Sequence, residues 1–360
     1  MKATVREGSE LSPAFLAPTL FSIFFSAMLQ VAFKDATEGV DIKSRLDRGL
    51  CSSNTKHFSA TSKLTLTTIR DLLFADDCAL AASSLEALQS LCERFSVAAL
   101  RFGLTISMKK NEYIFQPAPG NAYIPQVVLI DGSQLKDVVT FKYLGSGISN
   151  TADLGADIQG RISKATAAFG RLSKRLWNNR NIRLATKVAV YRAAVLTSLL
   201  YSCETWTLKR EHIQSLEKFH QTCLRRIARI KWIHKVTNYE VLARCNISTI
   251  QSVVDKACLR WTGHVVRMKD HRIPKALLYG RLVSGRSRGG NHKTYLNNIK
   301  STLRASGIDP HRLEDLARSM SIWCSTTKEG TKRAEADRIN CLISKRERRK
   351  ARADLAHQPT

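Results

Sequence analysis

The stretch Leu72-Leu73-Phe74-Ala75-Asp76-Asp77-Cys78-Ala79-Leu80-Ala81 decides how this chain is interpreted. Two apolar runs of strand character flank a pair of adjacent aspartates, which predicts a tight β-hairpin with both carboxylates at its tip. Adjacent carboxylates repel each other and resist removal from water, so a chain that places them between buried strands usually binds a cation there. Oxygen ligands favour a hard ion, which predicts Mg²⁺, with Mn²⁺ as a substitute.

The two aspartates are not expected to be equal ligands. Successive strand side chains point to opposite faces, so we expect Asp76 to bind the metal directly and Asp77 to support the site. In nucleotidyl transfer, two metals roughly 4 Å apart activate the attacking hydroxyl and stabilise the leaving oxygen. An Asp-Asp pair between apolar residues also occurs as an ordinary polar turn, and the ten residues alone leave that alternative open.

The net charge is +27 over 360 residues, and its distribution indicates a polyanion partner. Residues 1–160 carry 15 Lys and Arg against 16 Asp and Glu, whereas residues 161–300 carry 29 against 6. Residues 301–360 carry 13 against 8. A near-neutral first part followed by a strongly basic body is typical of a catalytic-type fold joined to a nucleic-acid-binding part.

Nine cysteines are scattered singly, without a Cys-x-x-Cys pair. This spacing favours reduced thiols in an intracellular protein, nuclear or cytoplasmic, over a disulfide framework. Cys258, His264 and His271 come nearest to a zinc-ligand cluster, but their spacing is poor. A buried thiol and surface imidazoles are therefore the favoured interpretation.

Several segments, in order along the chain, support a family assignment. Residues 74–77, Phe-Ala-Asp-Asp, resemble the catalytic core motif of the reverse transcriptases of non-LTR (LINE-type) retrotransposons, the endonuclease–reverse transcriptase type. Residues 102–112 resemble the next palm motif of that family, and residues 141–145, Phe-Lys-Tyr-Leu-Gly, resemble its primer-grip hairpin. Residues 261–268 and 307–310 resemble elements beyond the thumb.

The resemblance implies a reaction and roles for particular residues. RNA-directed DNA synthesis would use an RNA template, a DNA primer and a dNTP, with the primer hydroxyl attacking between metals held by Asp76 and Asp77. Lys110 would protonate the departing pyrophosphate, and Tyr143, Leu144 and Gly145 would hold the primer end. Two solvated lysines at 109 and 110 and an ordinary hairpin are the alternatives that the residues themselves leave open.

The N-terminus departs from the family pattern. Ser12-Pro13 stands where a Gln-Gly pair is expected ahead of Leu16-Ala17-Pro18, and the first catalytic aspartate and the fingers region should come earlier still. We therefore expect a chain truncated at its N-terminus and inactive as an isolated polymerase. The oligomeric state is open.

Residues 11–33 carry no charge, so a membrane anchor is one interpretation. Pro18, several Ser and Thr, and the balance of Lys2 and Arg6 by acidic residues favour a buried palm helix that begins near Pro18, and no membrane partner is expected. Further on, Ser83 and Glu86 form a capping-box pattern that opens a helix ending near Gly103. Residues 127–144 predict strands around the turn at 131–133.

From residue 153 the spacing of apolar residues predicts amphipathic helices, at 158–176, 183–203 and 211–230, with two more over 237–268. Their polar faces carry almost one sign of charge, which is typical of contact with a nucleic-acid backbone. A plain solvated surface is the alternative. The expected nucleic-acid contacts are Arg161, Lys164, Arg171, Lys174, Arg175, Arg225, Arg226 and Arg229, with Arg286 and Arg288 in a Gly/Arg-rich loop over 280–293.

Trp206, Trp232 and Trp261 could stack on bases, but core packing is the favoured interpretation for each. The loop over 280–293 is equally open to being a flexible linker. A short helical segment is expected to reach about residue 324. The basic run from Lys345 to Arg352 is expected to be a frayed helix, with nuclear targeting weakly supported.

The sequence thus predicts an α+β fold: a partial reverse-transcriptase palm over 1–150, a helical thumb over 151–235, and a helical, basic region with a flexible tail over 236–360. A non-catalytic nucleic-acid-binding protein derived from such an element is the alternative function. A membrane-tethered basic protein is a third interpretation that rests only on residues 11–33.

Overall fold

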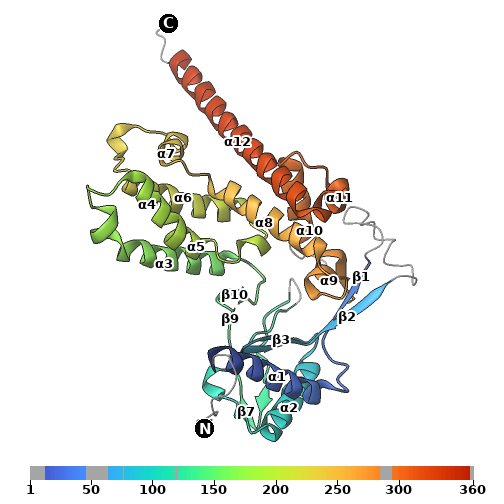
Figure 1. Cartoon of the computed structure of the whole chain (residues 1–360). Coiled ribbons are helices and arrows are strands. Elements are labelled where there is room, and N and C mark those ends of the chain that lie inside the picture. Colours follow the sequence, from blue (N-terminus) through green and yellow to red (C-terminus); the bar gives the residue numbers. More distant parts are fainter. Residues whose placement is uncertain (1–12, 46–63, 76, 118–120, 284–293, 357–360) are drawn as a thin grey trace.

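The protein has an N-terminal lobe and a larger helical part, which lie at opposite ends of the molecule (Figure 1). The lobe combines two helices with short strand ribbons, and the helical part begins after residue 150. The assignments of these parts as palm and thumb stay predictions. The computed structural model describes residues 13–45, 64–75, 77–117, 121–283 and 294–356.

Helices α1 (Pro13–Phe33) and α2 (Leu85–Arg101) pack together and form the core of the lobe. Apolar residues three and four apart lie on the facing sides, as helical periodicity requires. The buried members are Phe25, Met28, Leu29, Ala32 and Phe33 of α1 and Leu91, Ala98 and Ala99 of α2.

Both helices differ in detail from the prediction. Helix α1 begins at Pro13 instead of near Pro18, and Leu20, Ile23 and Val31 on its other side are exposed, so it is buried along one face only. The N-cap of α2 is Ser84 instead of Ser83, and its hydroxyl accepts a hydrogen bond from the Ala87 amide at 3.2 Å. Gly103, at φ +69°, follows the helix as predicted.

The strands of the lobe pair mostly as two-stranded ribbons. Antiparallel pairs are β3 with β4, β6 with β7 and β9 with β10, and β5 pairs with β8 in parallel. The turn predicted at 131–133 joins Leu129–Ile130 to Ser133–Gln134 through Asp131 and Gly132, both at positive φ, as a two-residue hairpin turn requires. Their bounds are β3 (Asp71–Phe74), β4 (Asp77–Leu80), β5 (Glu112–Tyr113), β6 (Leu129–Ile130), β7 (Ser133–Gln134), β8 (Lys136–Asp137), β9 (Thr140–Tyr143) and β10 (Ser146–Ser149).

A three-stranded sheet joins the lobe to the helical part. It runs β11 (Gly280–Leu282), β1 (Val40–Ser44), β2 (Thr65–Ile69), with Ile42 opposite Leu282. The predicted loop over 280–293 is a strand for its first three residues. Gly280 allows β11 to lie close to β1 and to the end of the preceding helix. A Cβ at this position would lie 2.6 Å from Ile42 Cγ2 and 2.3 Å from the Ala276 carbonyl oxygen.

The helices over residues 155–254 share one hydrophobic core that extends from Ile158 to Val254, across the predicted boundary at 235. The helix predicted over 158–176 is α3 followed by a π-turn, and the one over 183–203 is split into three pieces. The helices predicted over 211–230 and 237–268 are present. The elements are α3 (Gly155–Arg171), η3 (Ser173–Trp177), α4 (Leu184–Val190), η4 (Tyr191–Leu196), α5 (Thr197–Leu199), η5 (Cys203–Thr205), α6 (Arg210–Ile227), η6 (Trp232–His234), α7 (Asn238–Cys245) and α8 (Ile250–Arg267).

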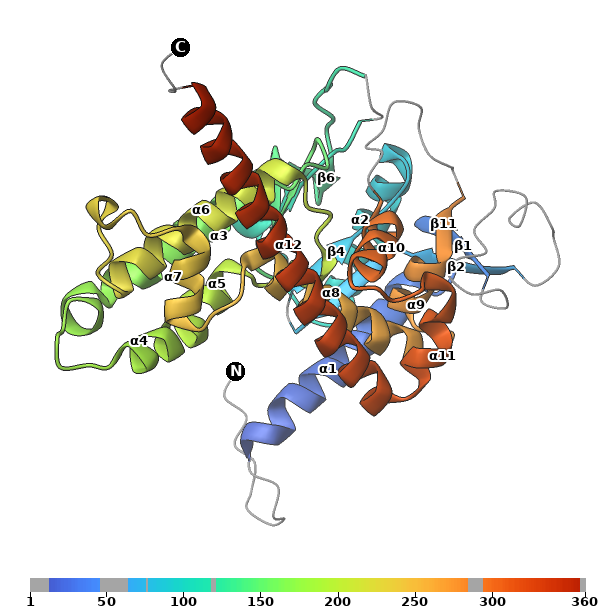
Figure 2. The ribbon, with the colours of Figure 1, turned by 90° about the horizontal axis from the view of Figure 1, so that it is seen from above.

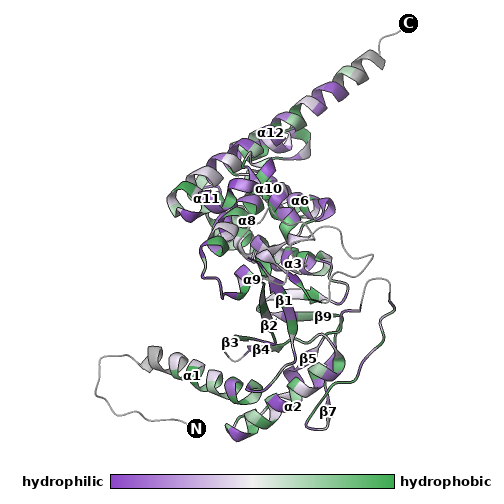
Figure 3. Ribbon diagram, turned by 90° about the vertical axis from the view of Figure 1, so that its right-hand side faces the viewer, coloured by the Kyte–Doolittle hydropathy of each residue, from purple (hydrophilic) through white to green (hydrophobic). Residues whose placement is uncertain are grey.

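A second core continues from Cys258 to Trp323. Trp323 is 1% exposed, lies against Gly263 of α8, and donates its indole N–H to the Leu259 carbonyl oxygen at 2.9 Å. The helix expected over the basic run from Lys345 to Arg352 is present as the last part of one long helix, α12, which crosses α8 (Figure 2) and projects away from the lobe (Figure 3). The elements are α9 (Ile273–Tyr279), α10 (Tyr295–Ala305), η7 (Pro310–Arg312), α11 (Leu313–Arg318) and α12 (Met320–Ala356).

Within the described ranges, no helix is both long enough and apolar enough to cross a lipid bilayer. Helix α1, the segment for which a membrane anchor was considered, is among the helices that this covers.

Candidate nucleic-acid site at two adjoining hairpins

The β3–β4 ribbon is the hairpin that the aspartate stretch predicts. Phe74 lies opposite Asp77, and Ala75, which follows Phe74, has a φ of +52°. A left-handed first turn residue suits the twist of a two-residue hairpin. Asp77 is the first residue of β4 and is exposed. Asp76, the predicted metal ligand, lies outside the described residues.

The two faces of this hairpin have different surroundings. Leu73, Cys78 and Leu80 pack against the α1–α2 core. Residues directly opposite in an antiparallel pair share a face, so Asp77 lies on the same outer face as Phe74, which is 62% exposed. The hairpin therefore presents a carboxylate beside an aromatic ring on its solvent side.

The β9–β10 ribbon brings the predicted primer-grip residues to this first hairpin. Leu144 and Gly145 form its turn, with φ of +48° and +81°, and Tyr143 lies opposite Ser146. The Tyr143 hydroxyl donates a hydrogen bond to the Leu72 carbonyl oxygen of β3 at 2.9 Å. Burial, followed by the nearby Cys78 and Asp77, raises the pKa of Tyr143. The hydrogen bond places the phenol next to the aspartate hairpin.

Helix α3 holds the second hairpin from the other side. The Asp157 carboxylate accepts a hydrogen bond from the Gly147 amide at 3.0 Å, and the Arg161 guanidinium donates to the Ser146 hydroxyl at 3.0 Å. Arg161 also lies 3.5 Å from Asp157 and 4.6 Å from the centre of the Tyr201 ring. Because Arg161 is only 4% exposed, its contacts in this structure are with the chain itself. It positions the hairpin.

The other predicted contacts are spread over the helical part. Lys164, Arg171, Lys174 and Arg175 are exposed along α3 and η3, and the Lys164 ammonium lies 3.5 Å from the Gly145 carbonyl oxygen. Arg225 donates to the Val236 carbonyl oxygen and to Asn238, and Arg229 donates to the Asn178 carbonyl oxygen at 2.8 Å. The guanidinium of Arg226 lies 5.7 Å from the centre of the Phe169 ring. Lys110, the predicted proton donor, belongs to the lobe and is exposed at the end of the turn η2 (Met108–Lys110). Arg286 and Arg288 lie outside the described residues.

The donor chemistry fits a magnesium site only in part. Asp77 offers one exposed carboxylate at the hairpin tip, and its predicted partner, Asp76, is not described. Among the residues that the structure describes, no three His, Cys, Asp or Glu side chains lie together as metal ligands. Mg²⁺ at this hairpin therefore stays a prediction, and no reaction step is derived through it.

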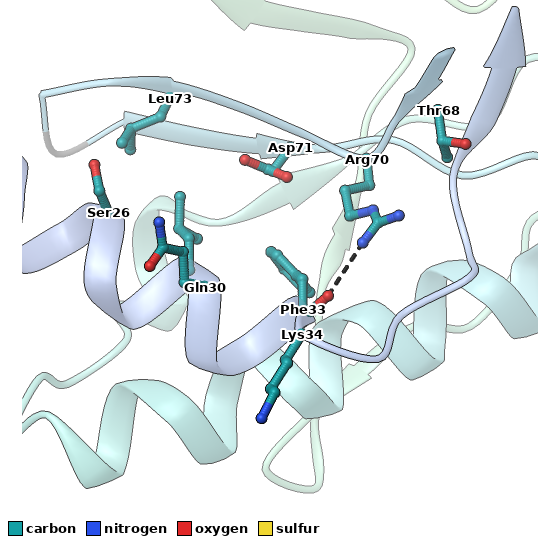
Figure 4. Close-up of a pocket in the computed structure, with 9 residues that line it drawn as sticks. Ser26, Gln30, Phe33, Lys34, Thr68, Arg70, Asp71 and Leu73 are labelled. Atoms are coloured by element: carbon teal, nitrogen blue, oxygen red, sulfur yellow. Dashed lines mark hydrogen bonds between the residues drawn. The ribbon is translucent and has the colours of Figure 1, made fainter. Parts of the chain in front are cut away.

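A cleft lies beside the hairpin, between α1 and the strands β2 and β3 (Figure 4), and it was not predicted from the sequence. Its volume is about 640 Å³. Arg70 donates to the Phe33 carbonyl oxygen at 3.1 Å, and burial raises the pKa of the neighbouring Asp71 despite the charge of Arg70. The polar lining comes from segments about 40 residues apart: Ser26, Gln30, Lys34, Thr68, Arg70 and Asp71.

Comparison with known proteins relates the chain to mobile elements. Over 210 residues it is 24% identical to a protein of Caenorhabditis elegans described as uncharacterized and transposon-derived. The matched segment covers 57% of this chain and 74% of that protein. No known family profile matches the chain. The likeness suggests a transposon origin for this chain, which is the coarser part of what the sequence motifs predict.

Proposed function

We propose that this chain derives from the reverse transcriptase of a non-LTR retrotransposon and binds nucleic acid across the β3–β4 and β9–β10 hairpins. The observation that carries the proposal is the hydrogen bond from the Tyr143 hydroxyl to the Leu72 carbonyl oxygen. Two segments whose bonded residues are 71 positions apart, each resembling a motif of one active site, are in direct contact. The transposon-derived relative supports the same origin.

The ancestral enzyme would have catalysed RNA-directed DNA synthesis, with the roles divided between the two hairpins, and the isolated chain is expected to be inactive as a polymerase. Asp76 and Asp77 would hold Mg²⁺ near the primer hydroxyl and the dNTP. The turn Tyr143-Leu144-Gly145 would hold the primer end, and Lys110 would donate a proton to the leaving pyrophosphate. Residues 1–150 would be the palm, residues 151–235 the thumb, and residues 236–360 the basic C-terminal region.

A second candidate function is nucleic-acid binding without catalysis. The basic residues Lys164, Arg171, Lys174 and Arg175 are exposed on α3 and η3, and no Asp or Glu occurs between 161 and 200. A face of one charge attracts the phosphate backbone of RNA or DNA whatever its sequence. This candidate needs the helical part but not the aspartates.

The experiment that separates the two candidates is Mg²⁺-dependent extension of a DNA primer on an RNA template by the purified full chain. If the chain polymerises, Asp76→Asn abolishes extension because it removes the predicted metal-binding charge. The matched control is Asp35→Asn, an exposed aspartate just beyond α1, which should leave extension unchanged.

If extension is absent but binding to labelled RNA weakens steeply as salt rises, the non-catalytic candidate stands. If there is neither extension nor salt-sensitive binding, both candidates are wrong.

A further inference from the structure

Trp232 is the most exposed large apolar side chain in the described part of the molecule, at 86%. Trp177, Trp206 and Trp323 are each buried to 3% exposure or less, so core packing holds for Trp206 but is wrong for Trp232. Its neighbour Ile233 is exposed at 56% but carries no aromatic ring. Three other tryptophans of the chain are buried, so an indole as exposed as that of Trp232 indicates a surface that binds a partner.

The indole is presented by a well-bonded turn. Residues 228–237 connect α6 to α7, here called the α6–α7 turn, at the outer edge of the helical part (Figure 1). The Lys231 amide donates to His234 Nδ1 at 3.1 Å, and the Lys235 amide donates to the Trp232 carbonyl oxygen at 3.0 Å. Arg225 closes the turn through the Val236 carbonyl oxygen at 2.9 Å. A partner therefore meets a surface whose backbone is already ordered, which lowers the entropy cost of binding.

The charge around Trp232 has one sign. Residues 218–239 contain six Lys and Arg and no Asp or Glu. Arg229 donates to the Asn178 carbonyl oxygen, which joins the α6–α7 turn to the 178–183 segment, where Arg180 and Arg183 are exposed. The next acidic residue, Glu240, accepts a hydrogen bond from the Thr237 amide at 3.2 Å in the N-cap of α7.

We infer that Trp232, flanked by Lys231 and Lys235, is a stacking site for a base of single-stranded nucleic acid. An indole face stacks on any unpaired base, and neighbouring ammonium groups attract the phosphates on either side of it. Bases in a duplex are already stacked on each other, so the site selects single strands. The inference rests on the proposed nucleic-acid binding and deepens it by naming the form of the ligand.

The test measures the affinity of the full chain for a short labelled oligo(dT) and for a labelled duplex, with Trp232→Ala, Trp232→Phe and the control Ile233→Ala. Trp232→Ala is expected to weaken oligo(dT) binding by roughly fivefold to a hundredfold, and Trp232→Phe to restore part of it. Duplex binding and the salt dependence should stay unchanged, because no phosphate contact is removed. Ile233→Ala should behave as the wild type.

Three outcomes would overturn the inference. If the wild type binds oligo(dT) and Trp232→Ala binds it equally well, the stacking site is wrong while the proposed function stands. If light scattering shows self-association that Trp232→Ala abolishes without changing oligo(dT) affinity, the surface meets a second copy of the chain instead. If the wild type binds no nucleic acid in a salt-dependent way, the proposed function fails as well.

Discussion

The two hairpins of the lobe and the core of the helical part are stabilised in different ways. Each hairpin is a two-stranded ribbon: the first packs one face on the α1–α2 core, and the second is held by hydrogen bonds to Leu72 and to helix α3. The helices instead have continuous hydrophobic cores and also bury two histidines, His212 and His220, and Arg161. The difference indicates that the stability of the molecule resides in the helical part, whereas the hairpins are arranged for contact with a ligand.

The largest expected effect comes from the helical core. Trp323→Ala would remove an indole that fills the space over Gly263 and would leave a cavity between α12 and α8. Such substitutions cost about 3–5 kcal/mol of unfolding free energy, to be measured by urea denaturation. Trp232→Ala is the matched control, because its exposed indole packs against little and should change stability by less than about 0.5 kcal/mol. Equal losses in the two variants would contradict the comparison.

A smaller effect is expected from pH. His220 is fully buried beside the Tyr191 hydroxyl at 2.8 Å, and burial lowers its pKa from 6.5 to about 4. Between these two pKa values, His220 is therefore protonated in the unfolded chain and mostly neutral in the folded chain. The contribution of the neutral, buried His220 to the free energy of unfolding is fully present above pH 6.5 and is lost as the pH falls toward 4. By pH 5 the loss amounts to about 2 kcal/mol.

Urea denaturation at pH 7.5 and pH 5 measures this loss. His220→Gln should flatten the pH dependence, and the same change at the exposed His271 should leave it intact. An unchanged pH dependence in His220→Gln would assign the acid sensitivity to other groups.

The smallest expected effect lies at the hairpins. Tyr143→Phe removes the hydroxyl that bonds to Leu72 and should cost about 1 kcal/mol or less of unfolding free energy. Hydrogen exchange should nevertheless become faster at the β9–β10 amides, because the ribbon loses its tie to β3 while α3 is unaffected. Unchanged exchange in β9 and β10 would mean that α3 alone holds the ribbon.

Local patterns were predictable from the sequence. The aspartate hairpin, the turn at 131–133 and helices α6, α7 and α8 follow from periodicity and turn residues a few positions apart. The strand β1 was missed because its segment is polar and its partner β11 lies far along the chain. The burial of Arg161 also could not be predicted, since it depends on Asp157, Ser146 and Tyr201 meeting in space.

The candidate site was predictable in its motifs but not in its contacts. The sequence indicates Asp77 and Tyr143 separately, and only the fold shows that the two ribbons touch. The exposure of Trp232 was missed because residue type alone favours the core for tryptophan. The cleft at Asp71 was missed because helix α1 and strand β3 contribute its lining jointly.

The pairing of β1 with β11 has a consequence for synthesis on the ribosome. Ile42 and Leu282 are about 240 residues apart, so the first strand emerges long before its partner exists. Until then β1 has β2 on one side and an open edge on the other, and open edges invite pairing with other chains. Closing so long a loop is also slow. Nascent chains released before Gly280 would keep that edge uncovered, and we expect them to aggregate.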